Sequence, residues 1–246
     1  MPSHLSDIGF IAETEDEFLE LHDQARRHGT AHSTPDGTYY RWSSGSGVEL
    51  WAQVDPGDEG IGLVPHFDGT TRIQLGLASV IRREGDTALD GSLYAWAEPV
   101  DGGRDGLFPV VFDQPDHRLS PASFPSIAWV QLAAFAREPL SLFATEADYV
   151  APHPLPPAVE SFIPVGTFKE NAVAKESPEA IAFFTGRILN AALRRNPHTG
   201  RPFYWLRVKT LGGEVDVVAD PELVSATPVS GGVVQGTFWL SGRLTG

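Results

Sequence analysis

The sequence predicts an α+β fold built mostly of antiparallel strands. Three observations support this prediction: short strand-forming runs recur between turn residues, 25 glycines and 20 prolines supply about one residue in five, and only one segment has a strong helix signature. Hydrophobic residues make up 41% of the 246 residues and charged residues 20%, so the chain can bury enough apolar surface to fold.

The helix signature lies between residues 15 and 28. Thr14 followed three residues later by Glu17 is a capping-box pattern, acidic residues open the segment, and basic residues close it before Gly29. We therefore predict a helix from Glu15 to His28. Ahead of it, the apolar run from Asp7 to Ala12 predicts a short buried strand.

From Gly37 onward the chain alternates strand-forming runs with turns. The turn Gly45-Ser46-Gly47 between TYYRWSS and VELWAQV predicts a hairpin. The alanines between Ile127 and Ala136 also allow a helix, but we favour a strand there. Further strands are predicted at Arg72 to Val80, Ser92 to Glu98, Pro109 to Phe112 and Ile127 to Ala136, and Thr145 with Asp148 predicts a short capped helix.

A proline cluster at residues 152–157 predicts a boundary. We divide the chain into an acidic α+β domain (1–151), a proline-rich connection (152–180) and a barrel-like β domain (181–246). The last part reads as four strands separated by turns, an antiparallel meander that curls into a small barrel. Gly186 and Gly236 lie inside these strands, where glycine often marks a bulge or bend.

Charge and cysteine content limit the function classes. The net charge is −14, but the part from Ile181 onward carries +3 and the remainder −17, so nucleic-acid binding by the chain as a whole is disfavoured. The absence of cysteine, of a leader-like N-terminus and of a long apolar run predicts a cytoplasmic protein without a membrane span. There is no Walker-type or dinucleotide-binding glycine motif.

The order of strand, capped helix and three strands ending in Gly47-Val48-Glu49-Leu50 resembles one βαβββ module of the vicinal oxygen chelate superfamily, the glyoxalase and bleomycin-resistance group. The resemblance covers residues 4–54. In that family, a histidine on the first strand and a glutamate on the last strand bind a divalent metal, which implies His4 and Glu49 as ligands here.

His66 and Asp68 in VPHFDG form a second metal-like grouping, alone or with Glu49. Alternate residues of one strand point to the same side, and imidazole with carboxylate suits a divalent ion. A turn in which Asp68 bonds its own backbone near Gly69 explains the same residues. The resulting candidate metal ligands are His4, Glu49 and His66.

Residues 181–246 resemble an OB-like barrel, a fold that binds oligonucleotides or oligosaccharides on one face. Within RPFYWLRVKT, period-two alternation places Phe203, Trp205, Arg207 and Lys209 on one face, a combination suited to base stacking and phosphate contact. The alternative is a packed aromatic layer crossed by arginine stems.

The sequence alone does not determine a function. The leading hypothesis is a non-catalytic binding or interaction protein with a protein or small-molecule partner, because no constellation unites a nucleophile with a base. The alternatives are a metal-dependent enzyme of the vicinal oxygen chelate type and single-stranded nucleic-acid binding by the C-terminal barrel. No catalytic residue and no cofactor is predicted, and a divalent metal enters only with the first alternative.

Overall fold

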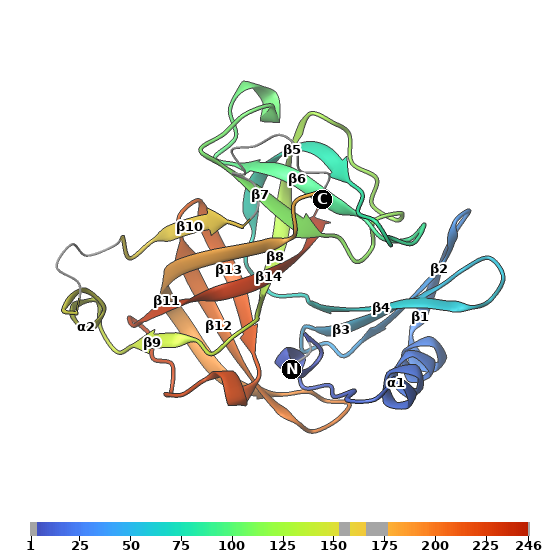
Figure 1. Cartoon of the computed structure of the whole chain (residues 1–246), viewed down its shortest axis with the longest axis horizontal. Helices are drawn as coiled ribbons and strands as arrows, with labels where there is room; N and C mark the ends of the chain where they lie inside the picture. The colour runs from blue at the N-terminus through green and yellow to red at the C-terminus, as the bar shows by residue number, and fades with distance from the viewer. Residues whose placement is uncertain (1–3, 153–157, 166–176, 246) are drawn as a thin grey trace.

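The computed structural model describes residues 4–152, 158–165 and 177–245. The described chain contains a four-stranded sheet with a helix packed on it and a ten-stranded sheet (Figure 1). Most strand pairs are antiparallel, as predicted. None of the described helices combines the length and apolar composition that crossing a membrane requires.

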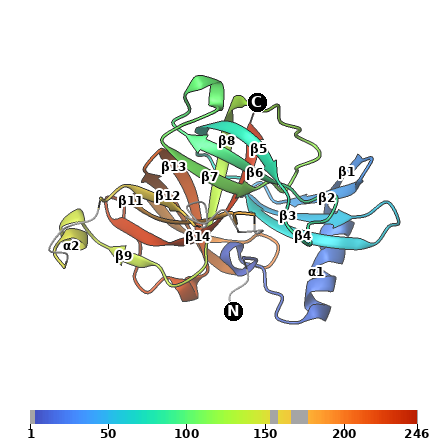
Figure 2. The same cartoon turned by 45° about the horizontal axis from the view of Figure 1, so that its top comes forward.

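Helix α1 (Glu15–His28) has the predicted bounds. Thr14 Oγ1 accepts a hydrogen bond from the Glu17 amide, and the Glu17 carboxylate accepts one from the Thr14 amide, so the predicted capping box is formed. Figure 2 shows α1 beside the four-stranded sheet, and the buried Leu21 and Ala25 pack with core residues of that sheet.

The four-stranded sheet is an antiparallel meander in the order β1-β2-β3-β4. Its strands are β1 (Thr30–Thr34), β2 (Gly37–Ser43), β3 (Val48–Val54) and β4 (Gly60–Phe67). The predicted hairpin joins β2 and β3, which pair from Thr38 with Val54 to Ser43 with Glu49. Every residue of the inner strand β3 is buried.

The predicted strand from Asp7 to Ala12 is wrong. Residues Ser6–Ile8 form a 3₁₀ helix, η1, which Gly9 ends in the left-handed conformation with φ of 78°. A Cβ at Gly9 would lie 2.8 Å from the Asn196 Cβ, so both the backbone angle and the space favour glycine. The small region is therefore αββββ and lacks the first strand of the expected βαβββ order.

The large sheet has the order β10-β11-β12-β13-β8-β5-β6-β7-β14-β9. Its strands are β5 (Ile73–Ile81), β6 (Ser92–Ala97), β7 (Phe108–Asp113), β8 (Ser126–Ala136), β9 (Ser141–Phe143), β10 (Ser161–Pro164), β11 (Ile181–Arg195), β12 (Pro202–Thr210), β13 (Gly213–Ala219) and β14 (Val233–Thr245). A short helix, α2 (Glu146–Val150), has the predicted cap at Thr145, and two further 3₁₀ helices, η2 (Asp101–Gly103) and η3 (Pro221–Leu223), lie in loops.

Strand pairing closes this sheet on itself twice. β8 pairs with both β13 and β14, and β14 also pairs with β11, so β11, β12, β13, β8 and β14 form a closed ring of pairings. β14 also pairs with β7, which closes a second ring of β5, β6, β7, β14 and β8. In Figure 1, β8 and β14 cross the centre between β11–β13 on the left and β5–β7 at the top.

The two segments β5–β8 and β11–β14 have the same pairing pattern. In each, three strands form a meander, the fourth pairs with the first, and the fourth also pairs in parallel with the third strand of the other segment. The register shifts between Leu77 and Ser79 in β5 and between Ile188 and Asn190 in β11. Eight of the ten strands of the large sheet therefore form a twofold repeat of one four-strand unit, which leaves out β9 and β10.

Strand pairing crosses the boundaries of the predicted division into 1–151, 152–180 and 181–246. β8, from the first part, lies between β13 and β14 of the last part, and β10, from the connection, pairs with β11. Residues 153–157 of the predicted proline cluster lie outside the described residues. Gly186 and Gly236 are paired within their strands, and a Cβ at Gly186 would lie 2.4 Å from Val208 Cγ1.

Asp216 anchors the segment that joins the two sheets. This fully buried carboxylate on β13 accepts hydrogen bonds from the Thr71 amide (3.0 Å), the Thr71 hydroxyl (2.6 Å) and the Trp205 indole N–H (2.8 Å). Thr71 lies in the segment that joins β4 to β5. A buried carboxylate with this many donors is satisfied, so the position is structural.

Candidate functional site

The structure brings two of the three predicted metal ligands together. Glu49 on β3 and His66 on β4 are directly opposite each other in the strand register, and both are fully buried. Cross-strand partners lie on the same face of a sheet. This face packs against β14 of the large sheet, where His66 Nδ1 lies 2.9 Å from the Ser241 hydroxyl.

Both oxygens of the Glu49 carboxylate are engaged by protein donors. Arg41 donates to Oε1 from Nε at 2.9 Å and also from Nη2, and the Trp51 indole donates to Oε2 at 2.9 Å. Arg243 Nη1 lies 3.6 Å from Oε2. Glu49 therefore holds two guanidinium groups beside the strand.

The two arginines extend this network. Arg243 donates from Nε to the buried Asp116 at 3.0 Å, and Arg41 lies 3.6 Å from Asp68. Their Cζ atoms are 5.0 Å and 5.6 Å from the centre of the Trp51 ring. The cluster of Arg41, Glu49, Asp116 and Arg243, which we call the buried ion cluster, thus pairs each charge with an opposite one.

His66 is a neutral histidine within this interface. Burial, with a further contribution from the Arg243 charge, lowers its pKa to about 3. Its Nε2 atom and the Oε1 atom of Gln131, on the neighbouring β8, are both buried without a hydrogen-bond partner in the described structure. One is able to donate and the other to accept, so the two groups are chemically complementary.

His4 does not join Glu49 and His66. Its ring stacks on Trp239 at 4.6 Å between centroids, and its Nδ1 lies 3.8 Å from Asp7 Oδ2. Burial, with a contribution from Arg137, lowers the pKa of His4 to about 4. Across the described residues, no three His, Asp or Glu side chains lie close enough together to hold one metal ion.

The predicted aromatic and basic face of β12 divides into a buried and an exposed half. Phe203 and Trp205 are buried, and Arg194 covers the Trp205 ring with its Cζ 3.8 Å from the ring centre. Arg207 and Lys209 are exposed, and they pair with Glu214 and Glu160 respectively. The aromatic rings of this face therefore expose little surface.

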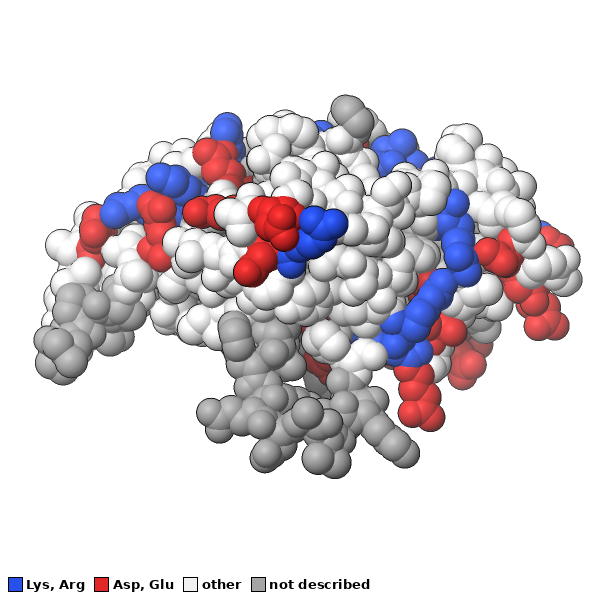
Figure 3. Space-filling view, turned by 90° about the horizontal axis from the view of Figure 1, so that it is seen from above, with Lys and Arg blue, Asp and Glu red and all other residues white. Residues whose placement is uncertain are grey.

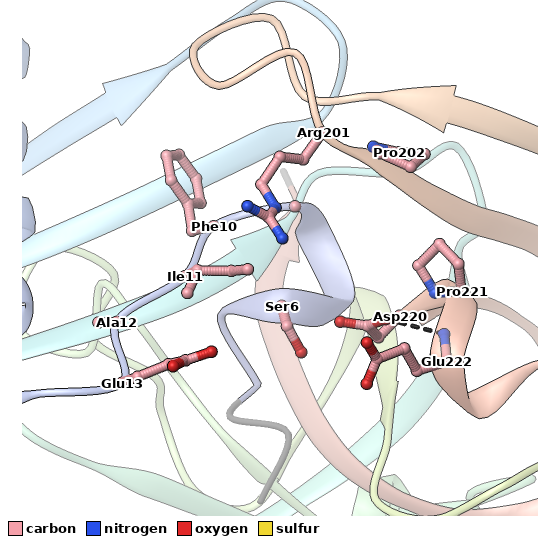
Figure 4. A pocket seen from close by; sticks show the side chains of 11 residues that line it. Ser6, Phe10, Ile11, Ala12, Glu13, Arg201, Pro202, Asp220, Pro221 and Glu222 are labelled. Atoms are coloured by element: carbon pink, nitrogen blue, oxygen red, sulfur yellow. Dashed lines mark hydrogen bonds between the residues drawn. The ribbon is translucent and has the colours of Figure 1, made fainter.

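A cavity of about 660 Å³ opens beside the N-terminal segment (Figure 4). Three stretches of chain that are far apart in the sequence form its wall: the η1 region and the residues after it, the start of β12, and η3. The lining residues are Ser6, Gly9, Phe10, Ile11, Ala12, Glu13, Arg201, Pro202, Asp220, Pro221 and Glu222.

Long-range hydrogen bonds fix the wall of this cavity. The Asn196 amide side chain donates to the Ile8 carbonyl at 2.8 Å, and the Thr199 hydroxyl donates to the Gly9 carbonyl at 2.7 Å. The Asp220 amide donates to Asp7 Oδ1 at 2.9 Å. Three bonds between residues about 200 positions apart hold the N-terminal segment on the C-terminal strands, so the cavity is preformed.

The charged side chains around the cavity are not paired with one another. In Figure 4, the Arg201 guanidinium lies on one side and the carboxylates of Glu13, Asp220 and Glu222 lie on the other. Within the described part of the chain, no salt bridge involves any of these four side chains. Asp220 accepts one hydrogen bond, from the Glu222 amide at 2.9 Å, through Oδ1.

On the face seen in Figure 3, acidic and basic side chains lie next to each other in small groups, and uncharged surface separates these groups. It shows no broad area of one sign, unlike the cavity wall, where acidic groups outnumber the basic one.

Comparisons with protein-family models, with curated proteins and with solved structures found no match to this chain.

Sequence reasoning did not find the cavity residues. The run from Asp7 to Ala12 predicts a strand, and nothing in its pattern links it to the residues after Ile181. The pairing of Asp7 with Asp220 and of Gly9 with Thr199 is visible only once the chain is folded.

Proposed function

We propose that this chain is a binding protein for a small organic molecule, which it holds in the cavity between the N-terminal segment and β12. The observation that carries the proposal is the cavity itself, whose wall is assembled by long-range hydrogen bonds and lined by unpaired charges. This agrees with the non-catalytic binding role favoured by the sequence.

The size and chemistry of the wall support binding. A volume of about 660 Å³ lies within the range of roughly 300–1,000 Å³ that holds small-molecule ligands. Ile11, Pro202 and Pro221 supply apolar surface, while Arg201 and three carboxylates supply polar groups that can orient a ligand.

A thermal-shift screen with a library of small metabolites tests the proposal. Bound ligand raises the melting temperature because it stabilises only the folded state. Ile11→Trp, which fills the cavity, is expected to abolish the shift, whereas Leu19→Trp on the exposed face of α1 is expected to keep it. A library without any hit, or hits that both variants retain equally, would contradict the proposal.

A metal-dependent enzyme of the vicinal oxygen chelate type is the second candidate, and the cross-strand juxtaposition of Glu49 and His66 favours it. A metal would have to displace the Trp51 or Arg243 contact at Oε2. Elemental analysis of the purified protein tests this candidate: stoichiometric metal that is lost in His66→Ala would support it, and metal-free protein of full stability would refute it.

Single-stranded nucleic-acid binding by an OB-like barrel is the third candidate. In support, the closed ring of β11, β12, β13, β8 and β14 counts five strands, as an OB-like barrel does, and Arg207 and Lys209 on β12 are exposed. Binding of labelled oligonucleotides at low salt, weakened by Arg207→Gln, would support it. No mobility shift at low ionic strength would remove it.

A further inference from the structure

The charges around the cavity indicate what kind of molecule it takes. We propose that the ligand is a small zwitterion with surplus positive charge, of the chemistry of a dibasic amino acid or a short basic peptide with a free carboxylate. This inference rests on the binding function proposed above and adds the ligand class to it.

Three carboxylates face one guanidinium across the cavity, which gives the lining a net charge of −2. In the buried ion cluster, by contrast, Glu49 lies against both Arg41 and Arg243. Charges that a fold uses for its own stability are paired in this way, whereas Arg201, Glu13 and Glu222 take part in no salt bridge within the described structure. Unpaired groups at a preformed wall remain available to a ligand.

The arrangement of the carboxylates does not favour a single metal ion as the occupant. Glu13, Asp220 and Glu222 come from two separate stretches of chain, and no described group of three acidic or histidine side chains is close enough to share one ion. Acidic groups that are spread around a wall suit an organic cation, whose ammonium groups are separated by several bonds.

Arg201 adds a requirement for an anionic group. A guanidinium binds a carboxylate through two parallel hydrogen bonds, which orients the ligand as well as attracting it. A phosphate dianion would gain the same contact but would be repelled by three carboxylates, so a singly charged carboxylate fits the balance of charges better.

A buried carboxyl, Asp7, lies behind the wall. Asp7 is 1% exposed, its Oδ1 accepts the Asp220 amide, and its Oδ2 has no hydrogen-bond partner in the described structure. Burial, and to a lesser extent the charge of Asp220, raises the pKa of Asp7 well above its usual value, although the Asp220 amide opposes this. A cationic ligand near Asp220 would reduce the contribution of the Asp220 charge to the raised pKa of Asp7.

Isothermal titration with defined probes tests the ligand class. The probes are L-lysine, lysyl-lysine, cadaverine, which lacks the carboxylate, and L-glutamate, which lacks the second ammonium group. We expect L-lysine and lysyl-lysine to bind about tenfold more tightly than cadaverine, and L-glutamate to bind least, with affinities that fall as salt increases.

Two charge variants with matched controls locate the groups that bind. Arg201→Gln is expected to weaken L-lysine about tenfold and not to weaken cadaverine, whereas Glu222→Gln weakens both. Arg104→Gln and Glu84→Gln, which alter exposed charges outside the cavity, are expected to change neither. Circular dichroism spectra identical to that of the parent confirm that each variant is folded.

The outcomes separate this inference from the proposed function. If library compounds bind and Ile11→Trp blocks them, but L-lysine and lysyl-lysine do not bind or an anion binds best, the ligand class is wrong and the binding function stands. If L-lysine binds equally to Ile11→Trp, its site lies elsewhere and the inference fails. If no compound of either set binds, both proposals fail.

Discussion

The buried ion cluster and the cavity wall both gather arginines and carboxylates, but they use them differently. Around Glu49, each guanidinium lies against a carboxylate, and Trp51 supplies a further donor. Around the cavity, Arg201 lies across an open space from three carboxylates and pairs with none of them within the described structure. The first group holds two sheets together, and the second is the group that we propose binds a ligand.

The physical reason for the difference is burial. Glu49 and Asp116 are withdrawn from water, and a charge in that position is tolerated only when it is paired and hydrogen-bonded. Glu13, Arg201 and Glu222 are exposed, so water satisfies them when no ligand is present. Removal of a charge should therefore be costly in one region and nearly neutral in the other.

The largest effect is expected for Glu49→Ala. The variant leaves Arg41 and Arg243 beside each other without the buried carboxylate that joins them, and the loss of one partner of a buried pair costs about 3–5 kcal/mol. Urea unfolding monitored by fluorescence measures the change. A loss below about 1 kcal/mol would mean that the cluster does not hold the sheets together.

Acid should destabilise the protein through His66. The unfolded histidine binds a proton below its usual pKa of 6.5, whereas the folded ring stays neutral down to about pH 3. The unfolded state therefore binds more protons in this window, and His66 contributes a loss of about 1.4 kcal/mol per pH unit as pH falls below 6.

His66→Gln provides the comparison for this window. Between pH 6 and pH 4, the free energy of unfolding should fall less steeply with pH in the variant than in the parent, by the slope that corresponds to about one bound proton. Above pH 7.5, the two proteins should show the same dependence on pH. Equal slopes in acid would show that the His66 ring is protonated in the folded protein.

Asp7→Asn should stabilise the protein at alkaline pH. The folded carboxyl keeps its proton at pH values where the unfolded one has lost it, so the parent loses stability as pH rises from about 4 to the raised pKa. Asparagine does not titrate, and its amide group can donate to His4 Nδ1, which lies 3.8 Å from Asp7 Oδ2 and has no partner in the described structure.

We expect a gain of about 1 kcal/mol at pH 8 that shrinks toward zero near pH 4, measured by urea unfolding at both values. This dependence is opposite in sign to that of His66. A variant that is less stable than the parent at pH 8 would contradict the assignment of a protonated Asp7.

The smallest effect is expected at the cavity. Arg201→Gln and Glu222→Gln remove charges that pair with nothing in the described structure, so each should change the free energy of unfolding by less than about 0.5 kcal/mol. A loss of about 2 kcal/mol in the free energy of unfolding of either variant would show that the group removed stabilises the fold. The two regions would then not differ in how they use their charges.

Local signals in the sequence predicted local structure correctly. The capping box at Thr14 and Glu17 gives helix α1 its start, and the glycines at 45 and 47 give the β2–β3 hairpin its turn, because each feature depends on residues a few positions apart. β8 and the four strands after Ile181 were predicted for the same reason. β1 was missed because Thr30–Thr34 is a short, polar edge strand.

Long-range features could not be predicted. In the repeat of β5–β8 in β11–β14, the residues beside the register shift, Leu77 and Ile188, are both buried and apolar. Two positions earlier, however, Leu75 in one copy corresponds to Gly186 in the other. The two copies therefore share a pattern of burial more than residue identity. Ring closure joins residues about 100 positions apart, and the cavity joins residues about 200 apart. The sequence also carried no sign that Asp216 is buried, because its donors Thr71 and Trp205 meet it only in the folded chain.

A crystal structure of the protein grown with saturating lysyl-lysine tests the central claim most directly. We predict density in the cavity, with the peptide carboxylate on Arg201 and ammonium groups toward Glu13, Asp220 or Glu222. An empty cavity at saturating peptide, or peptide bound only on another surface, would contradict the claim that these unpaired charges form a binding site.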